Sequence, residues 1–323
     1  MAEWLVEEGI GEHRAIRLEG DRIVAARVAW PGELAAGHIE DAVLISRAAG
    51  SARGTARFAG GEEALVDKLP RSATEGARIR LEVTRPALGE RARRKLARAR
   101  PSEGAPRPAP SIAERLQQEG NAVRVVHAFP AGDFAELMAE AFSGHVAFPG
   151  GSLQFSPTPA MLLVDVDGAL DPRSLALAAV APLAEALQRF DVGGPVGIDF
   201  PTLADKPARR AVDDALAHAL ADWPHERTAM NGFGFVQLVA RLVRPSLLHR
   251  AAFQPAATAA RMALRQAEGL QGAGAIELSG HPSLAPEIEP FVPELERRSG
   301  REVRWRADAA LAVKAPHAQL VPR

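Results

Sequence analysis

Alternation of apolar and polar residues dominates the first hundred positions of the chain. Side chains of a strand point to opposite faces in turn, so this pattern predicts β-strands. The predicted strands are 22–30, 38–48, 51–60, 63–69 and 77–85. Short strands at even spacing with glycine-containing turns favour a small antiparallel barrel. The proline-rich stretch 101–110 predicts a linker after it.

The middle of the chain has a strand, helix, strand order. Residues 159–166 and 194–200 are mostly apolar runs, and 173–190 between them has helical periodicity. Asp171, followed by a proline, is the predicted N-cap of that helix. The order predicts a right-handed parallel unit, with a kink or break at Pro182 inside the helical pattern.

Three more helical patterns follow, at 206–221, 233–243 and 256–270. The last is rich in alanine and leads into a short terminal segment with mixed helix and strand character. The chain as a whole therefore has the order of a multi-module α/β protein.

Composition narrows the function classes. The 323 residues are 47% hydrophobic, enough for a sizeable core, and the net charge is −1, so any affinity for polyanions must come from local patches. One such patch is 71–107, with eleven lysines and arginines against four glutamates. The absence of cysteine excludes disulfides, thiolate metal sites and cysteine nucleophiles.

No apolar run approaches the roughly 20 residues that span a bilayer. The first residues, MAEWLVEEGIGEH, carry acids where a signal peptide carries bases. We therefore expect a soluble cytoplasmic protein with no membrane partner.

The predicted barrel is a candidate nucleic-acid-binding module, because small barrels bind single strands through basic, partly aromatic faces. The candidate contacts are Arg53, Arg57, Phe58, Arg78 and Arg80. The same alternation also suits arginines on the rim of the barrel and a phenylalanine in its core. The residues alone leave both interpretations open.

Two aspartates fall near the carboxyl ends of the predicted parallel strands, Asp165 and Asp199. Ligands bind at this edge of open α/β sheets. Neighbouring strands lie about 4.8 Å apart, so the two carboxylates can share one Mg²⁺, with Asp167 as a third ligand on the same face. Such a site suits hydrolysis of a phosphodiester, although a lone aspartate at a strand end is more often a cap or turn residue.

Several motifs occur in a fixed order between residues 141 and 247. They are PGGSL, an apolar strand ending in Asp-x-Asp, Val192-Gly193-Gly194, Ile198-Asp199-Phe200 and FG…RPSL. In this order and spacing the segment resembles the catalytic core of the ribonuclease E/G family. Residues 3–86 are similar, more weakly, to the start of that family, and 277–311 resembles its small C-terminal domain.

The resemblance implies an α+β arrangement of modules. An RNase-H-like subdomain is interrupted by an OB-type RNA-binding barrel, and a DNase-I-like catalytic subdomain and a small C-terminal α/β domain follow. The expected divisions are 1–34 and 111–147 for the RNase-H-like parts, 35–100 for the barrel, 101–110 for the linker, 148–249 for the catalytic subdomain and 250–323 for a helix plus the C-terminal domain.

The resemblance also implies a function. The family cleaves single-stranded RNA with Mg²⁺, for which Mn²⁺ is an expected substitute, and leaves a 5′-phosphate. Asp165 and Asp199 match its metal-binding aspartates, and Asp167 falls where many members carry an assisting Asn. We expect a Mg²⁺-dependent endoribonuclease in RNA processing or turnover.

Departures from the family pattern point to a trimmed and weakened member. The segment between barrel and core is too short for the family's sensor of 5′-monophosphate ends. The cysteines of the family's zinc link between subunits are missing, so we expect no zinc-linked dimer. Phe190 replaces a basic residue, Gly232 an arginine and Gln237 an acid. A catalytically weakened RNA-binding protein of the same fold is therefore the first alternative.

A second alternative is another enzyme class. The stretch 162–170, LLVDVDGAL, also resembles the first motif of haloacid dehalogenase-type phosphatases. Thr202, Lys206 and the pair Asp213 and Asp214 would complete that site, but they are crowded into one stretch. An α/β protein of unrelated function is the third.

Overall fold

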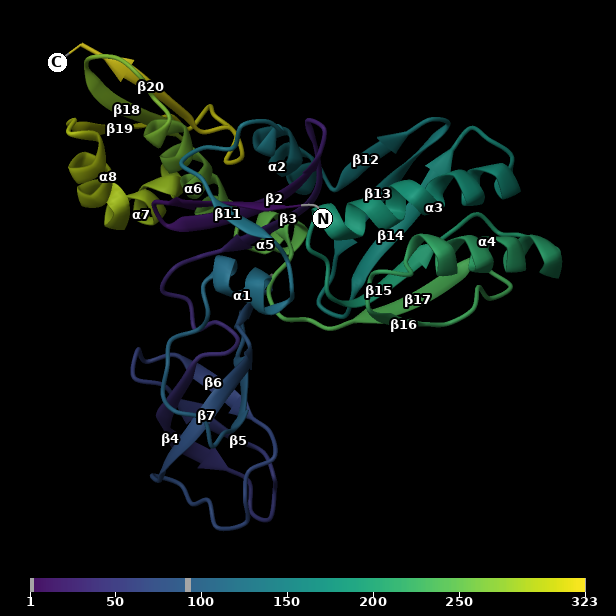
Figure 1. The fold of residues 1–323 in the computed structure, drawn as a ribbon, viewed down its shortest axis with the longest axis horizontal. Helices are drawn as coiled ribbons and strands as arrows, with labels where there is room; N and C mark the ends of the chain where they lie inside the picture. The colour runs from purple at the N-terminus through teal and green to yellow at the C-terminus, as the bar shows by residue number, and fades with distance from the viewer. Residues whose placement is uncertain (1–2, 91–93, 323) are drawn as a thin grey trace.

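The computed structural model describes residues 3–90 and 94–322. The chain is a mixed α+β protein built around a closed five-stranded barrel and separate sheets of four, six and three strands. Figure 1 shows the barrel projecting from the four-stranded sheet, with the six-stranded sheet and the C-terminal module on opposite sides of it. No helix in the described ranges combines the length and apolar character of a membrane span.

The central four-stranded sheet is made from two distant parts of the chain. Its strands, in spatial order, are β11 (Val123–Val125), β1 (Trp4–Gly9), β2 (Glu12–Glu19) and β3 (Arg22–Ala29). The chain leaves after β3, forms the barrel, and returns through α1 (Ile112–Gln118) to place β11 parallel to β1. The barrel is therefore an insertion into this sheet, and α2 (Phe134–Ser143) follows it.

The barrel confirms four predicted strands and adds one. Its strands are β4 (Ile39–Arg47), β5 (Gly54–Arg57), β6 (Glu63–Val66), β7 (Arg78–Arg85) and β10 (Ala97–Pro101). The unpredicted β10 pairs parallel with β6, so the barrel is not wholly antiparallel. The first predicted strand, 22–30, is β3 of the central sheet rather than a barrel strand.

The predicted linker is tied to the barrel. Pro101 ends β10, and Arg107 exchanges two backbone hydrogen bonds of 2.9 Å with Ile39 at the start of β4. A small hairpin, β8 (Leu88–Gly89) and β9 (Arg94–Lys95), precedes β10. The proline-rich segment is thus part of the barrel edge.

The six-stranded sheet contains the predicted parallel unit. Its strands, in spatial order, are β12 (His145–Phe148), β13 (Gly151–Pro157), β14 (Leu162–Gly168), β15 (Gly194–Asp199), β17 (Phe235–Ala240) and β16 (His225–Arg227). Strands β14 and β15 are parallel and are connected by α3 (Pro172–Arg189), which Asp171 caps as predicted. Helices α3 and α4 (Lys206–Ala219) lie together over one face of the sheet (Figure 1).

Two expectations about this module are wrong. The stretch 233–243 is not a helix. It contains strand β17, in which alternate residues, beginning with Val236 and Leu238, are buried against the helices. The apolar residues of 233–243 fit both helical and strand periodicity, so their pattern did not distinguish a helix from a strand. The expected kink or break at Pro182 is wrong as to the break, since α3 continues as one helix of 18 residues through this half-buried proline.

The C-terminal module contains the alanine-rich helix, whose prediction is confirmed by α6. Its elements are α5 (Leu247–Phe253), α6 (Pro255–Glu268), β18 (Ala275–Gly280), η1 (Pro282–Leu284), α7 (Ala285–Ile288), η2 (Glu289–Phe291), α8 (Val292–Ser299), β19 (Val303–Ala307) and β20 (His317–Val321). The three strands form the order β19-β18-β20. Alanines of α6 pack against β18 in a core separate from that of the six-stranded sheet.

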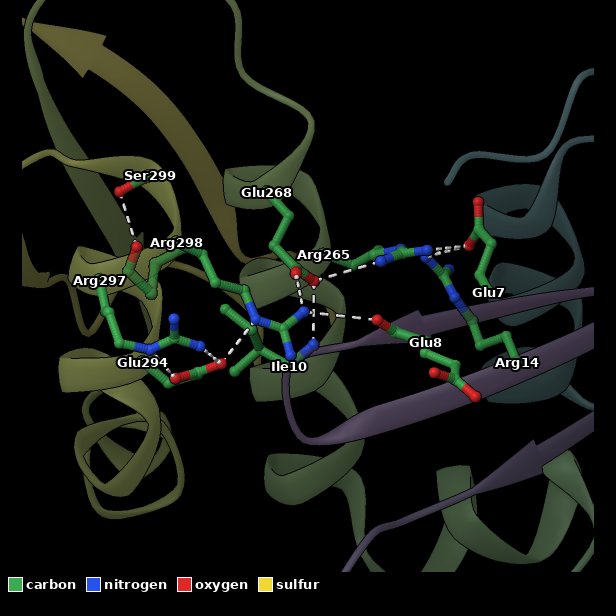
Figure 2. A network of polar contacts seen from close by, with 11 residues as sticks. Glu7, Glu8, Ile10, Arg14, Arg265, Glu268, Glu294, Arg297, Arg298 and Ser299 are labelled. Atoms are coloured by element: carbon green, nitrogen blue, oxygen red, sulfur yellow. Dashed lines mark hydrogen bonds and ion pairs between the residues drawn. The ribbon is translucent and has the colours of Figure 1, made fainter. Parts of the chain in front are cut away.

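A chain of alternating charges joins this module to the central sheet (Figure 2). Glu7 on β1 pairs with Arg14 on β2 at 3.2 Å and also with Arg265 on α6. Glu268, one turn further along α6, pairs with Arg265 and with Arg298 on α8, both at 3.2 Å. Each inner charge has an opposite neighbour, so the buried part of the network is compensated.

Trp30 joins the same two parts through its ring. The guanidinium carbons of Arg250 on α5 and Arg261 on α6 each lie 3.8 Å from the centre of the ring, and its Nε1–H donates to Glu12 at 3.1 Å. Desolvated cation–π contacts stabilise by about 2 kcal/mol each. This stack fixes α5, whose C-terminal residue Phe253 lies against Gly89 of the barrel hairpin.

His249 on α5 lies where the barrel meets the six-stranded sheet. Beside His249, Lys95 of the hairpin donates a hydrogen bond to the carbonyl oxygen of Pro159 at 2.7 Å. The Nε2 atom of His249 is shielded from solvent and has no hydrogen-bond partner among the described residues. Burial lowers the pKa of His249 to about 4, and the charges of Arg250 and Lys95 act in the same direction.

The lowered pKa of His249 predicts a loss of stability in mild acid. Above about pH 6.5 the ring is neutral in both states; as pH falls from 6.5 towards 4, the unfolded chain takes up a proton that the folded chain refuses. Between pH 7 and pH 5 this one group should lower the free energy of unfolding by about 2 kcal/mol. Urea unfolding of His249→Gln should show a pH dependence smaller by that amount, and an unchanged dependence would contradict the prediction. The same substitution at exposed His145 is the control.

Candidate functional site

The pairing of β14 with β15 places Asp165 directly opposite Asp199. Residues on either side of them, Val164, Val166 and Ile198, face the helices and are buried. Both carboxylates therefore point to the other face, which the helices do not cover, and both are exposed. The prediction that these two residues lie side by side on neighbouring strands is confirmed. Asp199 is the last residue of β15, whereas Asp165 lies in the middle of β14.

On this open face, the residues in register with the two aspartates carry no positive charge that could neutralise them. Asp165 is in register with Gln154 on β13, and Asp199 with Phe235 on β17. Gln154 donates its amide to the carbonyl of Ser143 at 3.1 Å. Within the described ranges the carboxylate of neither aspartate has a hydrogen bond or an ion pair. Like charges directly opposite on neighbouring strands are destabilising.

These residues fit a small divalent cation. Mg²⁺ is usually bound by one or two carboxylates, with waters and substrate phosphates completing its octahedron. Asp165 and Asp199 supply two carboxylates on one open face. Groups of three or more acidic or histidine side chains suited to a metal ion are absent from the described part of the chain. The pair is therefore a candidate for an open two-ligand site rather than for a closed cage.

Asp167 lies one step nearer the end of β14, on the same face. Its Oδ1 accepts from the N–H of Gly168 at 2.8 Å, which holds the carboxylate at the strand end. It is in register with Ser152 of β13 rather than with a residue of β15. Its position suits an outer contact to a water or to substrate better than a place in the pair.

The same edge carries exposed cations. Helices α3 and α4 begin just after β14 and β15, so their positive ends lie at the carboxyl edge of the sheet. Arg173 on α3 and Lys206 and Arg210 on α4 are exposed there, and in the described structure none of the three has a carboxylate partner. Carboxylates of Asp171 and Asp205 already cap the two helix N-termini, so the exposed cations are the groups at this edge that favour phosphate.

A tight turn beside Asp199 carries a residue that sequence reasoning missed. Phe233 is 81% exposed, although its backbone is fixed. Gly234 has φ of +89°, and a Cβ there would lie 2.3 Å from the carbonyl oxygen of Phe200. The signal for this turn in the sequence is the pair Phe233-Gly234, which was interpreted above only as part of the motif FG…RPSL.

Three arginines of the predicted basic face of the barrel form ion pairs with neighbouring acids. Arg53 pairs with Asp67 at 2.9 Å, Arg57 with Glu63 at 2.8 Å, and Arg80 with Asp41 at 2.9 Å. Hydrogen bonds from Arg80 hold the pKa of Asp41 below its ordinary value. Two of these pairs join residues directly opposite on neighbouring strands, so these arginines compensate local acids.

Phe58 corrects the aromatic part of the same prediction. Its ring is 3% exposed and belongs to the barrel core, where it lies 6.2 Å from the ring of His38. It cannot stack on a base. Arg78 is exposed and without a carboxylate partner in the described structure, and so is Arg98, which lies in register with half-exposed Leu65.

The departures from the family pattern fall in different environments. Phe190 is fully buried at the end of α3, edge-on to Phe155 at 5.6 Å, and lies in the core rather than on the open face. Gln237 is on the open face of β17, in register with Gly197. Gly232 is exposed, with no atom within 4 Å of a Cβ built there.

The phosphatase alternative gains no geometric support. Asp213 pairs with Arg227 at 3.0 Å and accepts the N–H of Met230 at 3.0 Å, a structural role. Lys206, Asp213 and Asp214 lie on one helix rather than at separate strand ends.

Comparison with protein-family models gives no match, and comparison with curated proteins gives none either.

Removing one of the paired carboxylates should stabilise the metal-free protein but weaken its binding of a metal ion. In buffer free of divalent cations, Asp199→Asn should raise the free energy of unfolding by about 0.2–1 kcal/mol, because it removes a like-charge pair. Mn²⁺ should bind the wild type and bind the variant about tenfold more weakly or worse, since one of two charged ligands is lost.

Isothermal titration and urea unfolding measure these two effects. Glu226→Gln removes a charge from the same face, on strand β16, and serves as the matched control. Equal Mn²⁺ affinity in all three proteins would show that the aspartate pair does not hold the metal.

Proposed function

We propose that the chain is a Mg²⁺-dependent endoribonuclease that hydrolyses phosphodiester bonds in single-stranded RNA. The observation that carries this proposal is the unpartnered pair of Asp165 and Asp199, held in register on an uncovered sheet face. A bound Mg²⁺ would supply a site for the scissile phosphate and lower the pKa of a water for attack on phosphorus.

The chain's own residues would bind and orient the substrate. Asp165 and Asp199 hold the cation, and Asp167 at the strand end orients a water or a ribose hydroxyl. Arg173 and Lys206 at the helix starts attract the flanking phosphates, because exposed cations favour anions. The same edge of the sheet thus carries the negative charges that a metal needs and the positive charges that a polyphosphate needs.

The barrel offers fewer unpaired cations as candidate RNA contacts than its sequence suggests. Most of its predicted contacts are compensated by carboxylates, which leaves Arg78 and Arg98 as the candidate phosphate contacts. With few free cations, RNA affinity should fall with salt by only a few units of slope in log K against log salt.

Cleavage of a fluorogenic single-stranded RNA tests the proposal directly. Wild type should cleave in Mg²⁺ and not in a chelator, and Asp199→Asn should lower the rate by about 10² or more, whereas Glu226→Gln should cleave normally. RNA binding with no metal-dependent cleavage in any of these proteins would favour the catalytically weakened binding protein of the same fold.

Gly232 offers a gain-of-function test of the weakened-enzyme interpretation. The space around it admits a side chain without a clash, and it lies in the turn beside the acidic pair. Gly232→Arg should raise the cleavage rate by about tenfold, because a cation at this place would stabilise charge developing on the phosphate. Gly232→Gln is the uncharged control. An equal rate in both variants would show that the charge at this position is irrelevant.

A further inference from the structure

Phe233 is the most exposed of the large apolar side chains in the described ranges. Its main chain, however, is held from both sides. The Oδ1 atom of Asn231 accepts from the N–H of Phe233 at 2.9 Å and from that of Phe235 at 3.1 Å. The turn is thus closed by its own side chain, and the ring projects from a fixed support.

The turn is also attached to the segment that follows Asp199. The N–H of Phe200 donates to the carbonyl of Gly234 at 3.2 Å, and the hydroxyl of Thr202 donates to the carbonyl of Phe233 at 3.3 Å. Phe233 therefore lies beside the residues immediately after a metal-ligand candidate. Its place is set by the same strand pairing that sets the acidic pair.

The surroundings of this ring favour a nucleobase over a protein partner. Protein interfaces use contiguous apolar patches of a few hundred Å², whereas the exposed neighbours of Phe233 in the turn and its attachment are Asn231, Gly232 and Thr202. A single rigid aromatic ring next to a phosphate-binding edge is the arrangement that stacks one unpaired base. The fixed backbone keeps the ordering entropy of such a contact low.

We propose that Phe233 is the platform on which the enzyme stacks one unpaired base adjacent to the scissile phosphate, and that it thereby selects single-stranded RNA. This inference rests on the proposed function for the phosphate's position. A base within a duplex is stacked and paired on both sides, so it cannot cover the ring without being extruded.

The experiment compares Phe233→Ala, Phe233→Trp and wild type on a set of short fluorogenic RNAs, each with one abasic nucleotide at a different position. Val239→Ala, a truncation of another exposed apolar residue of the same sheet, is the control. KM and kcat are measured in Mg²⁺, and RNA binding is measured separately by fluorescence anisotropy in the inactive Asp199→Asn background.

Wild type should lose affinity by about tenfold or more when one particular base next to the cut is missing. Phe233→Ala should show that loss on the intact RNA and no further loss on the abasic one, Phe233→Trp should restore wild-type behaviour, and Val239→Ala should match wild type.

Cleavage that requires Asp199 but has the same KM and the same abasic profile in Phe233→Ala would overturn the stacking role and leave the nuclease standing. Anisotropy that shows the Phe233-dependent base contact without any cleavage would retain the stacking role and overturn the nuclease. Absence of RNA binding by wild type would overturn both.

Discussion

The parallel register between β14 and β15 is the constraint on which the candidate site depends. A shift of one residue would turn Asp199 towards the helices and leave Asp165 without a neighbour, because successive side chains in a strand alternate between faces. Strand β15 starts at the Gly193-Gly194 pair, which thereby helps to set its register against β14. Gly194 has φ of +88°, and a Cβ on Gly193 would lie 2.8 Å from the carbonyl oxygen of Arg241. Side chains larger than hydrogen would move the start of β15.

The pair also depends on what covers the opposite face. Val164, Val196 and Ile198 are buried under α3 and α4, and their burial makes a slipped register unfavourable because it would place aspartates in an apolar layer. Hydrophobic burial on one face thus holds two like charges together on the other. The repulsion between them is on the order of 1 kcal/mol in water, small against the burial of several aliphatic side chains.

The sequence predicted the parts of this arrangement that local pattern determines. The capped helix after Asp171, the parallel strands and the matching aspartates follow from periodicity and chain order, and the structure confirms them. The strand β17 was misassigned because its apolar residues suit either period when the neighbouring strand is unknown. The sequence left two interpretations open for Phe58 and the barrel arginines, because burial and ion pairing depend on cross-strand partners, which a single sequence does not display.

An open site with only two carboxylates has a further consequence under the proposed function. The protein supplies too few ligands to saturate Mg²⁺, so the cation's coordination is completed by water and by substrate phosphate. Binding of metal and of RNA is then reciprocally coupled, because each provides part of the other's site. The cations at the starts of α3 and α4 add to this coupling, since they repel a free metal ion and attract the phosphate that accompanies it. Under the proposed function, the register of two strands would determine the geometry of the site, and the substrate itself would determine how tightly the metal is held.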